Sequence, residues 1–358
     1  MSESSPPNPR WKRRPQGSTW GDWGPDDQLG RLNLVTPEKV LQGIQEVKVG
    51  KTFCLSLPLD YPGGSIINPR RRPPVLKPNM RENSPIMGLP LRCYDPTALD
   101  VVSDDVVELT LQYSTQWDSL AHVGMYFDAD GGGVPEDCFY NGFKAGADIV
   151  GPTVYDAKGN PSPNPAAAGN ALGARSLGVE NMAVSCVQGR AVMIDLLANF
   201  GRSGKIVGYD DLMMVLEKDK VVVEPGDFVC IRTGFAELLL EMKKQPDPKV
   251  LFGTTSALDG RDDRLLQWIT DCGAVALLAD NYAVEAAPAR PCADDYCATL
   301  PLHNHCLFKL GCYLGEMWYH TELADWLRAN GRNRFLLTAP PLRLPGAVGS
   351  PATPVATV

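Results

Sequence analysis

The 358-residue chain has no long apolar run, since its longest uninterrupted stretch is residues 274–279. A helix that crosses a bilayer needs about 18 apolar residues or more, so the sequence predicts no transmembrane segment. Residues 1–7, M-S-E-S-S-P-P, lack the charged and apolar regions of a secretory signal. We therefore expect a cytoplasmic protein.

The sequence also lacks an excess of positive charge. Its 34 Lys and Arg face 42 Asp and Glu, which gives a formal net charge of −8. Phosphate neutralisation supplies most of the affinity of nucleic-acid binding, so nucleic acid is excluded as the main partner. Two short basic runs, residues 12–14 and 70–72, lie among prolines, and we expect them to be loop charges or subunit contacts.

Ordered cysteine motifs are missing as well. The ten cysteines include no C-x-x-C pair and no spacing typical of a small disulfide-bonded domain. They indicate buried, reduced thiols. Residues 131–133 are three glycines without the context of a phosphate-binding loop, so they predict a loop tip and no nucleotide site.

Composition divides the chain into a tail and one large domain. Residues 1–19, rich in Pro, Ser and Arg, predict a disordered or partner-wrapping arm, and residues 20–358 predict a single α/β domain. Within the domain, residues 58–98 and 130–174 are rich in Pro, Gly and Asn and predict long irregular loops. Long loops in compact domains are often functional, so we expect residues 58–98 to border the site.

Local patterns predict alternating strands and helices. Thr36 before Pro37 is typical of a helix start, and alternation over residues 106–113 predicts a strand that runs directly into residues 114–118. The remaining predictions are helices at 209–218, 261–271 and 316–329 and strands at 228–232 and 274–279. This order predicts a mixed α/β fold.

Histidine is scarce, with four in the chain, yet three of them fall within residues 303–320. His122 lies four residues after Asp118, just past a predicted strand, and His303 lies thirteen residues before Glu316. A carboxylate and an imidazole from each of two remote segments are the ligands that Zn, Mn or Fe sites use. The pattern therefore indicates metal binding or acid/base chemistry.

The stretch Q-Y-S-T-Q-W-D-S-L-A-H, residues 112–122, resembles the motif H-x-G-T-H-x-D-x-P-x-H of the cyclase family. That family of metal-dependent hydrolases includes bacterial kynurenine formamidase and isatin hydrolase. Residues 23–38, 226–234, 303–316 and the proline-rich tail are also similar to family segments. The resemblance implies a mixed-sheet swivelling β/β/α fold and a homo-oligomer, either a dimer or a tetramer.

The resemblance also implies roles for individual residues. Asp118, His303 and Glu316 match metal ligands, and His122 matches a histidine that shuttles protons. Gln112 and Gln116 stand where the motif has its first two histidine ligands. A glutamine oxygen is a weak neutral ligand, so we expect one divalent ion, Zn or Mn, rather than two, and a site without metal remains open.

Aromatic and acidic residues near these segments are candidates for substrate binding. Trp117, Tyr126 and Phe127 could stack on an aromatic acyl group, although such residues beside a strand often belong to the core. Asp280 and Glu285 follow a predicted buried strand at the end where α/β sheets place ligand groups. For these two the alternatives are a turn and a helix cap.

Two histidines are candidates for contacting the metal ligands without binding the ion themselves. His305 alternates with His303, so in an extended segment it faces the opposite way. His320 lies four residues after Glu316 and so on the same face of the predicted helix. The alternative for each is a packed histidine without a role in the site.

Taken together, the residues and the resemblance predict an enzyme that hydrolyses an amide, formamide, lactam or lactone bond in a small cyclic or aromatic metabolite. Two alternatives stay open. One is a lyase or dehydrating cyclase that uses His122 for proton transfer without a hydrolytic water. The other is a metal-free relative that binds a ligand without turnover, with Gln112 and Gln116 as the marks of that loss.

Overall fold

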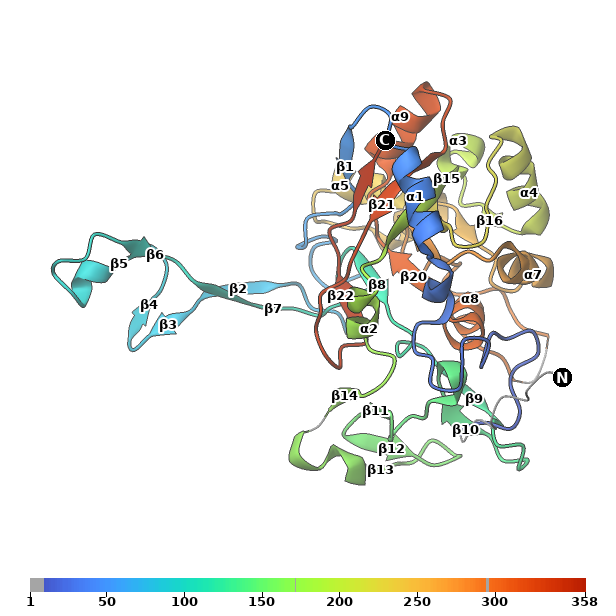
Figure 1. Ribbon diagram of the computed structural model, residues 1–358, viewed down its shortest axis with the longest axis horizontal. Coiled ribbons are helices and arrows are strands. Elements are labelled where there is room, and N and C mark those ends of the chain that lie inside the picture. Colours follow the sequence, from blue (N-terminus) through green and yellow to red (C-terminus); the bar gives the residue numbers. More distant parts are fainter. Residues whose placement is uncertain (1–9, 171, 294–295) are drawn as a thin grey trace.

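The computed structural model describes residues 10–170, 172–293 and 296–358. Its centre is a nine-stranded mixed sheet, drawn in Figure 1. In spatial order the strands are β1 (Thr52–Cys54), β23 (Val355–Thr357), β21 (Arg334–Thr338), β15 (Gln188–Asp195), β17 (Phe228–Arg232), β19 (Ala276–Ala279), β20 (Tyr313–Glu316), β8 (Gln116–Asp118) and β22 (Gly349–Pro351). The prediction of a mixed α/β fold is confirmed.

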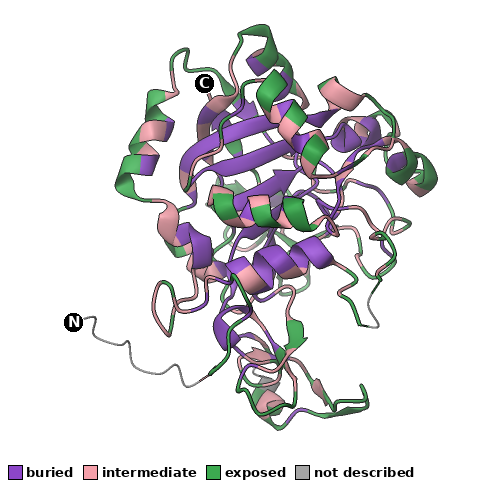
Figure 2. Cartoon of the chain, turned by 90° about the vertical axis from the view of Figure 1, so that its right-hand side faces the viewer, coloured by how far each residue is buried: buried purple, intermediate pink, exposed green. Residues whose placement is uncertain are grey.

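The middle of the sheet is parallel and fully buried. Strands β15, β17, β19 and β20 run in the same direction, while β21 and β8 pair antiparallel at its two sides. Every residue of β17 and of β19 is buried, as expected for parallel strands covered on both faces. Figure 2 shows these buried strands between helices whose outer faces are exposed.

Helices cover the sheet between successive strands. They are α1 (Pro37–Gln45), α2 (Val179–Val184), α3 (Leu196–Phe200), α4 (Tyr209–Lys218), α5 (Phe235–Glu241), α6 (Pro248–Thr254), α7 (Asp263–Cys272), α8 (Pro301–His303), the π-helix η5 (Asn304–Leu310) and α9 (Thr321–Ala329). Short 3-10 turns are η1 (Gly30–Leu34), η2 (Leu91–Cys93), η3 (Tyr140–Gly142) and η4 (Pro165–Asn170). In the described part of the chain, no helix combines the length and apolar composition that a membrane span requires.

Several local predictions are confirmed by the structure. Helix α4 and strand β17 have the predicted bounds. Thr36 caps α1 by accepting a hydrogen bond from the Lys39 amide, with Pro37 at the first helical position. Helix α7 and strand β19 each begin two residues later than predicted.

The predicted helix 316–329 is wrong in its first part. Glu316 is the last residue of strand β20, and α9 begins only at Thr321. Between them Met317 has a φ of 54°, which turns the backbone out of the strand and cannot continue into a helix. The segment at His303 is also not extended, because it lies in α8 and continues into η5.

The segment predicted as the loop 58–98 forms the first part of a projecting β arm, residues 75–108. It consists of β2 (Val75–Pro78) paired with β7 (Asp105–Glu108), β3 (Met80–Arg81) with β4 (Ser84–Pro85), and β5 (Leu89–Pro90) with β6 (Val101–Val102). Figure 1 shows the β arm extending away from the body. The predicted single strand 106–113 therefore ends at Glu108 and does not run into β8.

The second predicted loop, residues 130–174, also holds short strands. They are β10 (Glu136–Cys138) with β9 (Met125–Phe127), β11 (Ile149–Val150) with β14 (Gly173–Ala174), and β12 (Thr153–Tyr155) with β13 (Pro161–Pro163). A separate parallel pair is formed by β16 (Ile206–Val207) and β18 (Ala257–Leu258). The hairpins around residues 149–174 gather at one end of the molecule in Figure 1.

The N-terminal arm predicted for residues 1–19 falls partly outside the described residues. From residue 10 on, the chain packs on its own body: the Trp11 ring lies 6.2 Å from the Trp20 ring, and Trp11 Nε1 donates to Asn141 Oδ1 at 3.2 Å. The backbone amides of Lys12 and Arg13 both donate to the Ala129 carbonyl. Residues 10–19 are thus an ordered part of the domain, not a disordered arm.

The expectation of ten buried, reduced cysteines is wrong for half of them. Cys292 and Cys297 form a disulfide bond. Cys54, Cys93 and Cys186 are exposed. The sequence did not show this because the C-x-x-x-x-C spacing belongs to no recognised framework and because exposure depends on tertiary packing.

Candidate metal centre

Strand β8 places two polar side chains on one face of the sheet. Gln116 and Asp118 are completely buried, and successive strand residues point to opposite faces. Trp117 therefore points the other way, where its Nε1 donates to the Ala339 carbonyl at 2.8 Å and its ring packs edge-on against Trp318. With no exposed surface, Trp117 is a core residue and not the substrate-stacking residue that we expected.

His303 reaches the same place from helix α8. Its ring is held from behind by Glu285, whose Oε1 lies 2.8 Å from Nδ1 and also accepts the His303 backbone amide at 3.0 Å. The second Glu285 oxygen accepts the Leu302 amide. Glu285 therefore fixes the ring and leaves Nε2 facing the sheet, which is the arrangement that usually orients a metal-binding histidine.

Glu316 completes the cluster from the end of β20. It lies directly opposite Gln116 in the antiparallel pairing of β20 with β8. Its Oε1 is 3.1 Å from His303 Nε2, and His303 Nε2 is 3.9 Å from Asp118 Oδ2. Asp118, His303 and Glu316 thus offer three ligand atoms within 4.8 Å of one another, all buried.

Buried charge shifts the pKa values in the cluster. Burial raises the pKa of Asp118, and the neighbouring His122 opposes that rise. Burial also acts against the ionisation of Glu316, but the hydrogen bond from His303 and the charge of Arg71 lower its pKa to about 2. For His303, burial is outweighed by hydrogen bonds to Glu285 and Glu316, which raise its pKa to about 10.

One atom of the cluster shows that a divalent cation fits. Asp118 Oδ2 is buried and has no hydrogen-bond partner among the described residues. A buried carboxylate oxygen without a partner is costly, and a cation placed between it, Glu316 Oε1 and His303 Nε2 would remove that cost. Two carboxylates and one imidazole are a ligand set that Zn and Mn accept.

His122 lies at the edge of this cluster. Its Nε2 is 3.7 Å from Asp118 Oδ1, and its side chain keeps 21% of its surface exposed. It is the member of the group that a small molecule could reach, whereas Asp118 has no exposed surface.

An apolar cavity of about 650 Å³ is lined by residues that neighbour His122 and His303 in the sequence, although neither histidine lines it. Its wall includes Val123, which follows His122, and Asn304, which follows His303. Tyr126 also lines it and is 48% exposed. Of the three aromatic candidates, only Tyr126 is thus available to a ligand in this cavity, because Phe127 packs against Trp20 and Phe308 in the core.

The two glutamines lie beside the cluster without forming a second set of ligands. Gln116 directs its Nε2 toward Asp118 Oδ1 at 3.0 Å and Glu316 Oε2 at 3.2 Å. The Gln112 amide lies over Gly349, where a Cβ atom would come within 2.3 Å of its Nε2. Gly349 pairs with Asp118 across the sheet, so Gln112 is close to the carboxylate on the same face.

The remaining candidates have structural partners. Asp280 is buried at the end of β19, where it accepts the Thr233 and Gly234 amides, and burial raises its pKa to about 6. His305 Nε2 is 2.9 Å from Thr270 Oγ1 on α7, away from the cluster. His320 Nε2 donates to the Leu278 carbonyl at 2.9 Å. The premise that placed His320 beside Glu316 on one helix is wrong, because Glu316 ends a strand.

Sequence reasoning missed one charged residue of the site. Arg71 contacts Gln116 Oε1 at 3.4 Å and Glu316 Oε2 at 3.6 Å. We expected residues 70–72 to be loop charges or subunit contacts; for Arg71 this is wrong. The only signal was its position in the segment 58–98, which we expected to border the site and which does so through this residue.

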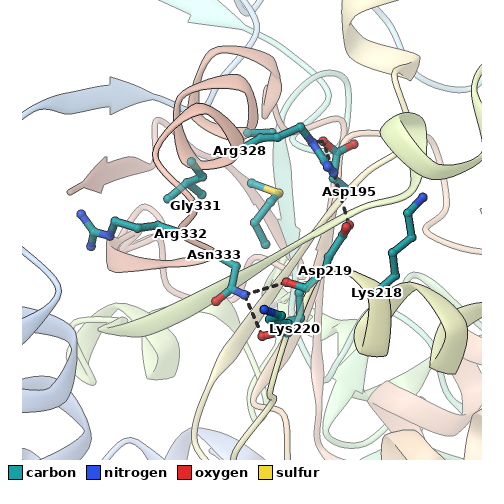
Figure 3. Close-up of a pocket in the computed structure, with 12 residues that line it drawn as sticks. Asp195, Lys218, Asp219, Lys220, Arg328, Gly331, Arg332 and Asn333 are labelled. Carbon is teal, nitrogen blue, oxygen red and sulfur yellow. Dashed lines mark hydrogen bonds and ion pairs between the residues drawn. The ribbon is translucent and has the colours of Figure 1, made fainter.

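A second hollow, shown in Figure 3, has a volume of about 270 Å³. It is lined by charged side chains that pair with one another: Arg328 lies 3.3 Å from Asp195 and 3.2 Å from Asp219. None of its lining residues belongs to the metal cluster. Since its two carboxylates, Asp195 and Asp219, already pair with Arg328, we do not assign chemistry to it.

Comparison with known proteins identifies the family to which the chain is similar. The family model described as "Putative cyclase" matches residues 53–286. A solved structure described as a novel cyclase shares 30% sequence identity and a TM-score of 0.71, covering 99% of this chain and 100% of its own. None of the curated proteins compared matches this chain.

Two more distant structures share the fold. Isatin hydrolase A from Ralstonia solanacearum has 13% identity and a TM-score of 0.53, over 86% of this chain and 91% of its own. An isatin hydrolase bound to the product analogue thioisatinate has 13% identity and a TM-score of 0.52, over 90% and 99% respectively. At this identity the likeness concerns the fold alone.

Proposed function

This chain belongs to the cyclase family, and from that premise we propose that it is a metal-dependent hydrolase acting on an amide, formamide, lactam or lactone bond. The observation that carries the proposal is the buried group Asp118, His303 and Glu316 with its unpaired Asp118 oxygen. The apolar cavity whose wall includes Val123 and Asn304, the sequence neighbours of His122 and His303, supports a small cyclic or aromatic substrate, because ligand sites are mostly apolar with a few polar groups.

The three ligands would hold one divalent ion, Zn or Mn. Such an ion supplies Lewis-acid polarisation of a carbonyl and makes a water molecule more acidic. Glu285 keeps the His303 ring in place through Nδ1, so that Nε2 remains directed at the site. Burial of all three ligands excludes bulk water and strengthens their electrostatic effect.

His122 is positioned to move the proton. Its Nε2 lies 3.7 Å from Asp118 Oδ1, and its side chain is 21% exposed, so a substrate can reach it. In hydrolysis it would accept a proton from water at Nε2 and later donate it to the leaving nitrogen or oxygen. Asp118 Oδ1 stabilises the imidazolium formed between these two transfers.

The cavity wall would select the substrate. Tyr126 and Val123 offer apolar contact, and two tyrosines of the wall, Tyr126 and Tyr296, are exposed. The isatin hydrolases among the structural relatives make isatin a reasonable first probe, together with an N-formyl arylamine and an aromatic lactone.

The proposal is tested by metal analysis and turnover on the same samples. Protein purified without a metal-chelating tag should contain about one Zn or Mn per chain, and Asp118→Ala and Glu316→Ala should lose it. Glu108→Gln, which removes an exposed carboxylate on the β arm, is the matched control and should retain it. Absence of metal from the wild type, with no uptake of added Mn²⁺ or Zn²⁺, would contradict the proposal and favour the metal-free binding relative.

Turnover in oxygen-18 water separates the hydrolase from a lyase or dehydrating cyclase. A hydrolase introduces one labelled oxygen into the acid product, whereas proton transfer by His122 alone introduces none. We expect incorporation of the label with at least one of the three probes. A product formed without label would assign the lyase chemistry instead.

A further inference from the structure

Arg71 is built into the centre from the segment that leads into the β arm. Its side chain is 16% exposed, and its NH1 lies 3.6 Å from Glu316 Oε2. The guanidinium carbon is 5.2 Å from the centre of the Tyr282 ring, and Asn68 in the same segment donates to the Tyr282 hydroxyl at 2.8 Å. These contacts hold the cation at the cluster, so it is not a surface charge that happens to approach.

The two carboxylates divide their oxygens between two sides of the site. Glu316 Oε1 lies 3.1 Å from His303 Nε2, and the unpaired Asp118 Oδ2 faces the same nitrogen at 3.9 Å. The other two oxygens, Asp118 Oδ1 and Glu316 Oε2, both accept from Gln116 Nε2. One side is therefore open to a cation, while the other is filled by an amide.

The orientation of that amide depends on Arg71. A carboxamide has an oxygen that accepts hydrogen bonds and a nitrogen that only donates. Because Arg71 NH1 donates to Gln116 Oε1 at 3.4 Å, the Gln116 nitrogen is turned toward the two carboxylates. A carboxamide NH₂ does not coordinate a metal, so this side of the site offers no ligand from Gln116.

Charge balance supports the same conclusion. Three buried carboxylates meet here, on Asp118, Glu316 and Glu285. Arg71 together with one divalent ion neutralises them when His303 is neutral, whereas a second divalent ion would leave an excess of positive charge. Uncompensated charge is expensive in a buried site.

We propose that Arg71, acting with Gln116, takes the place of a second metal ion and restricts this centre to a single ion at Asp118, His303 and Glu316. The inference rests on the proposed function, because it presumes that the first ion binds. Arg71 is a positioning residue: it acts on the ligands and on Gln116 and makes no contact assigned to the substrate.

The experiment measures Mn²⁺ stoichiometry and affinity by equilibrium dialysis, with electron paramagnetic resonance to detect paired ions. The wild type should bind one ion per chain. Arg71→Ala combined with Gln116→His removes the cation and supplies an imidazole, so it should bind two ions and give the spectrum of a coupled pair. Circular dichroism and thermal unfolding establish whether each variant is folded.

Arg71→Met provides a test that does not need the double variant. Removing a positive charge 3.6 Å from Glu316 should strengthen binding of the single ion, by about tenfold or more. A residue that merely braces the site would have the opposite effect, because its loss would loosen the ligands and weaken binding. Arg71→Lys retains the charge and should leave the affinity within about threefold of the wild type.

The outcomes separate the two proposals. No Mn²⁺ on the wild type contradicts the proposed function itself. One ion on the wild type and on the folded double variant, with weaker binding in Arg71→Met, contradicts the role of Arg71 and leaves the proposed function standing. Two ions on the wild type also overturn the inference, since the second place would then be free despite Arg71.

Discussion

At the scale of single residues, His303 is the point where a proton and a metal ion compete. Glu285 and Glu316 raise its pKa to about 10, so without metal the ring is protonated at neutral pH. A protonated imidazole cannot coordinate a metal. Metal binding must therefore displace a proton from His303.

This competition predicts a pH dependence of metal affinity. Since the proton is held up to a pKa of about 10, the affinity for Mn²⁺ should rise about tenfold per pH unit between pH 6 and 8 for the one proton displaced. Dialysis in buffers of equal ionic strength measures it. An affinity independent of pH in this range would show that His303 is already neutral or does not bind the ion.

In the metal-free protein the contribution of His303 to stability falls as the pH rises, whereas its affinity for metal increases. A histidine whose folded-state pKa is raised stabilises the fold below its unfolded pKa of about 6.5, and this contribution is lost as the pH rises toward about 10. Removing metal with a chelator should therefore lower the unfolding temperature more at pH 9 than at pH 6.5. An equal loss at both values would contradict the assigned protonation.

His122 carries a separate prediction about catalysis. His122→Gln keeps a polar side chain but removes the group that transfers the proton, so kcat should fall about 10²- to 10⁴-fold. Metal content should remain that of the wild type, because His122 is outside the group of three ligands. Steady-state kinetics and elemental analysis of one preparation check both parts, and loss of the metal would instead make His122 a ligand.

The candidate metal ligands could be predicted from the sequence through the family resemblance, whereas the residues that contact and orient them could not. Asp118 comes from one segment and His303 and Glu316 from a remote second one, and the structure brings them together. Glu285 was expected in a binding wall but holds His303, a contact that depends on how the loop after β19 meets α8. Arg71 could not be predicted, because the sequence pattern of a basic residue in a proline-rich loop is the same whether its side chain points to solvent or into the protein.

At the scale of elements, a buried ion cluster joins α1, β15 and β17. Asp227, with no exposed side-chain surface, lies immediately before β17 and pairs with Arg190 Nε at 2.8 Å and with Lys39 Nζ at 3.2 Å. Arg190 also reaches the second Asp227 oxygen at 2.9 Å, so the pair is bidentate. The cluster fixes the first helix against the middle of the sheet.

Breaking this cluster should destabilise the protein strongly. Asp227→Asn removes the buried carboxylate that pairs with Arg190 and Lys39 and leaves them only the partly exposed Glu224, so it should lower the free energy of unfolding by about 3 kcal/mol. Glu108→Gln breaks an exposed pair with Lys77, whose side chains are 59% and 77% exposed, and should cost less than about 1 kcal/mol. Urea unfolding of both variants tests the contrast, and similar losses would contradict it.

Elements with local signals were predicted well and elements with distant partners were not. Helix α4 and strand β17 follow from apolar spacing and a turn that the sequence shows directly. Strand β20 was not predicted, and its last residue Glu316 was taken as the start of a helix, because the strand depends on pairing with β19 and β8. Three residues of β8 form a strand only because β20 and β22 lie on either side.

At the scale of the whole molecule, the β arm projects from the body and leaves several of its apolar side chains exposed. Its paired Leu76 and Val107 are 65% and 43% exposed, and Met80, Met87 and Val101 are also exposed. A two-stranded ribbon is marginally stable alone in water. The sequence predicted a long loop at residues 58–98 but neither the β form nor the bounds of the arm, since short strands rich in proline lack a clear alternation.

These exposed side chains connect with the expectation of a homo-oligomer. If the β arm packs on a second copy, Leu76→Asp combined with Val107→Asp should shift the mass in light scattering toward the 38.9 kDa of one chain. Val222→Asp replaces an exposed valine on the body and should leave the mass unchanged. A wild type that is already monomeric at micromolar concentration would contradict the expectation.

The position of β8 in the sheet has a consequence for the order of folding during synthesis. Gln116 and Glu316 are 200 residues apart in the chain, so a nascent chain carries the first half of the site long before its partners leave the ribosome. Strands β15, β17 and β19 can pair earlier, because they follow one another directly. We expect metal to bind after the centre of the sheet has formed. It would then stabilise the strands that pair last and would not nucleate folding.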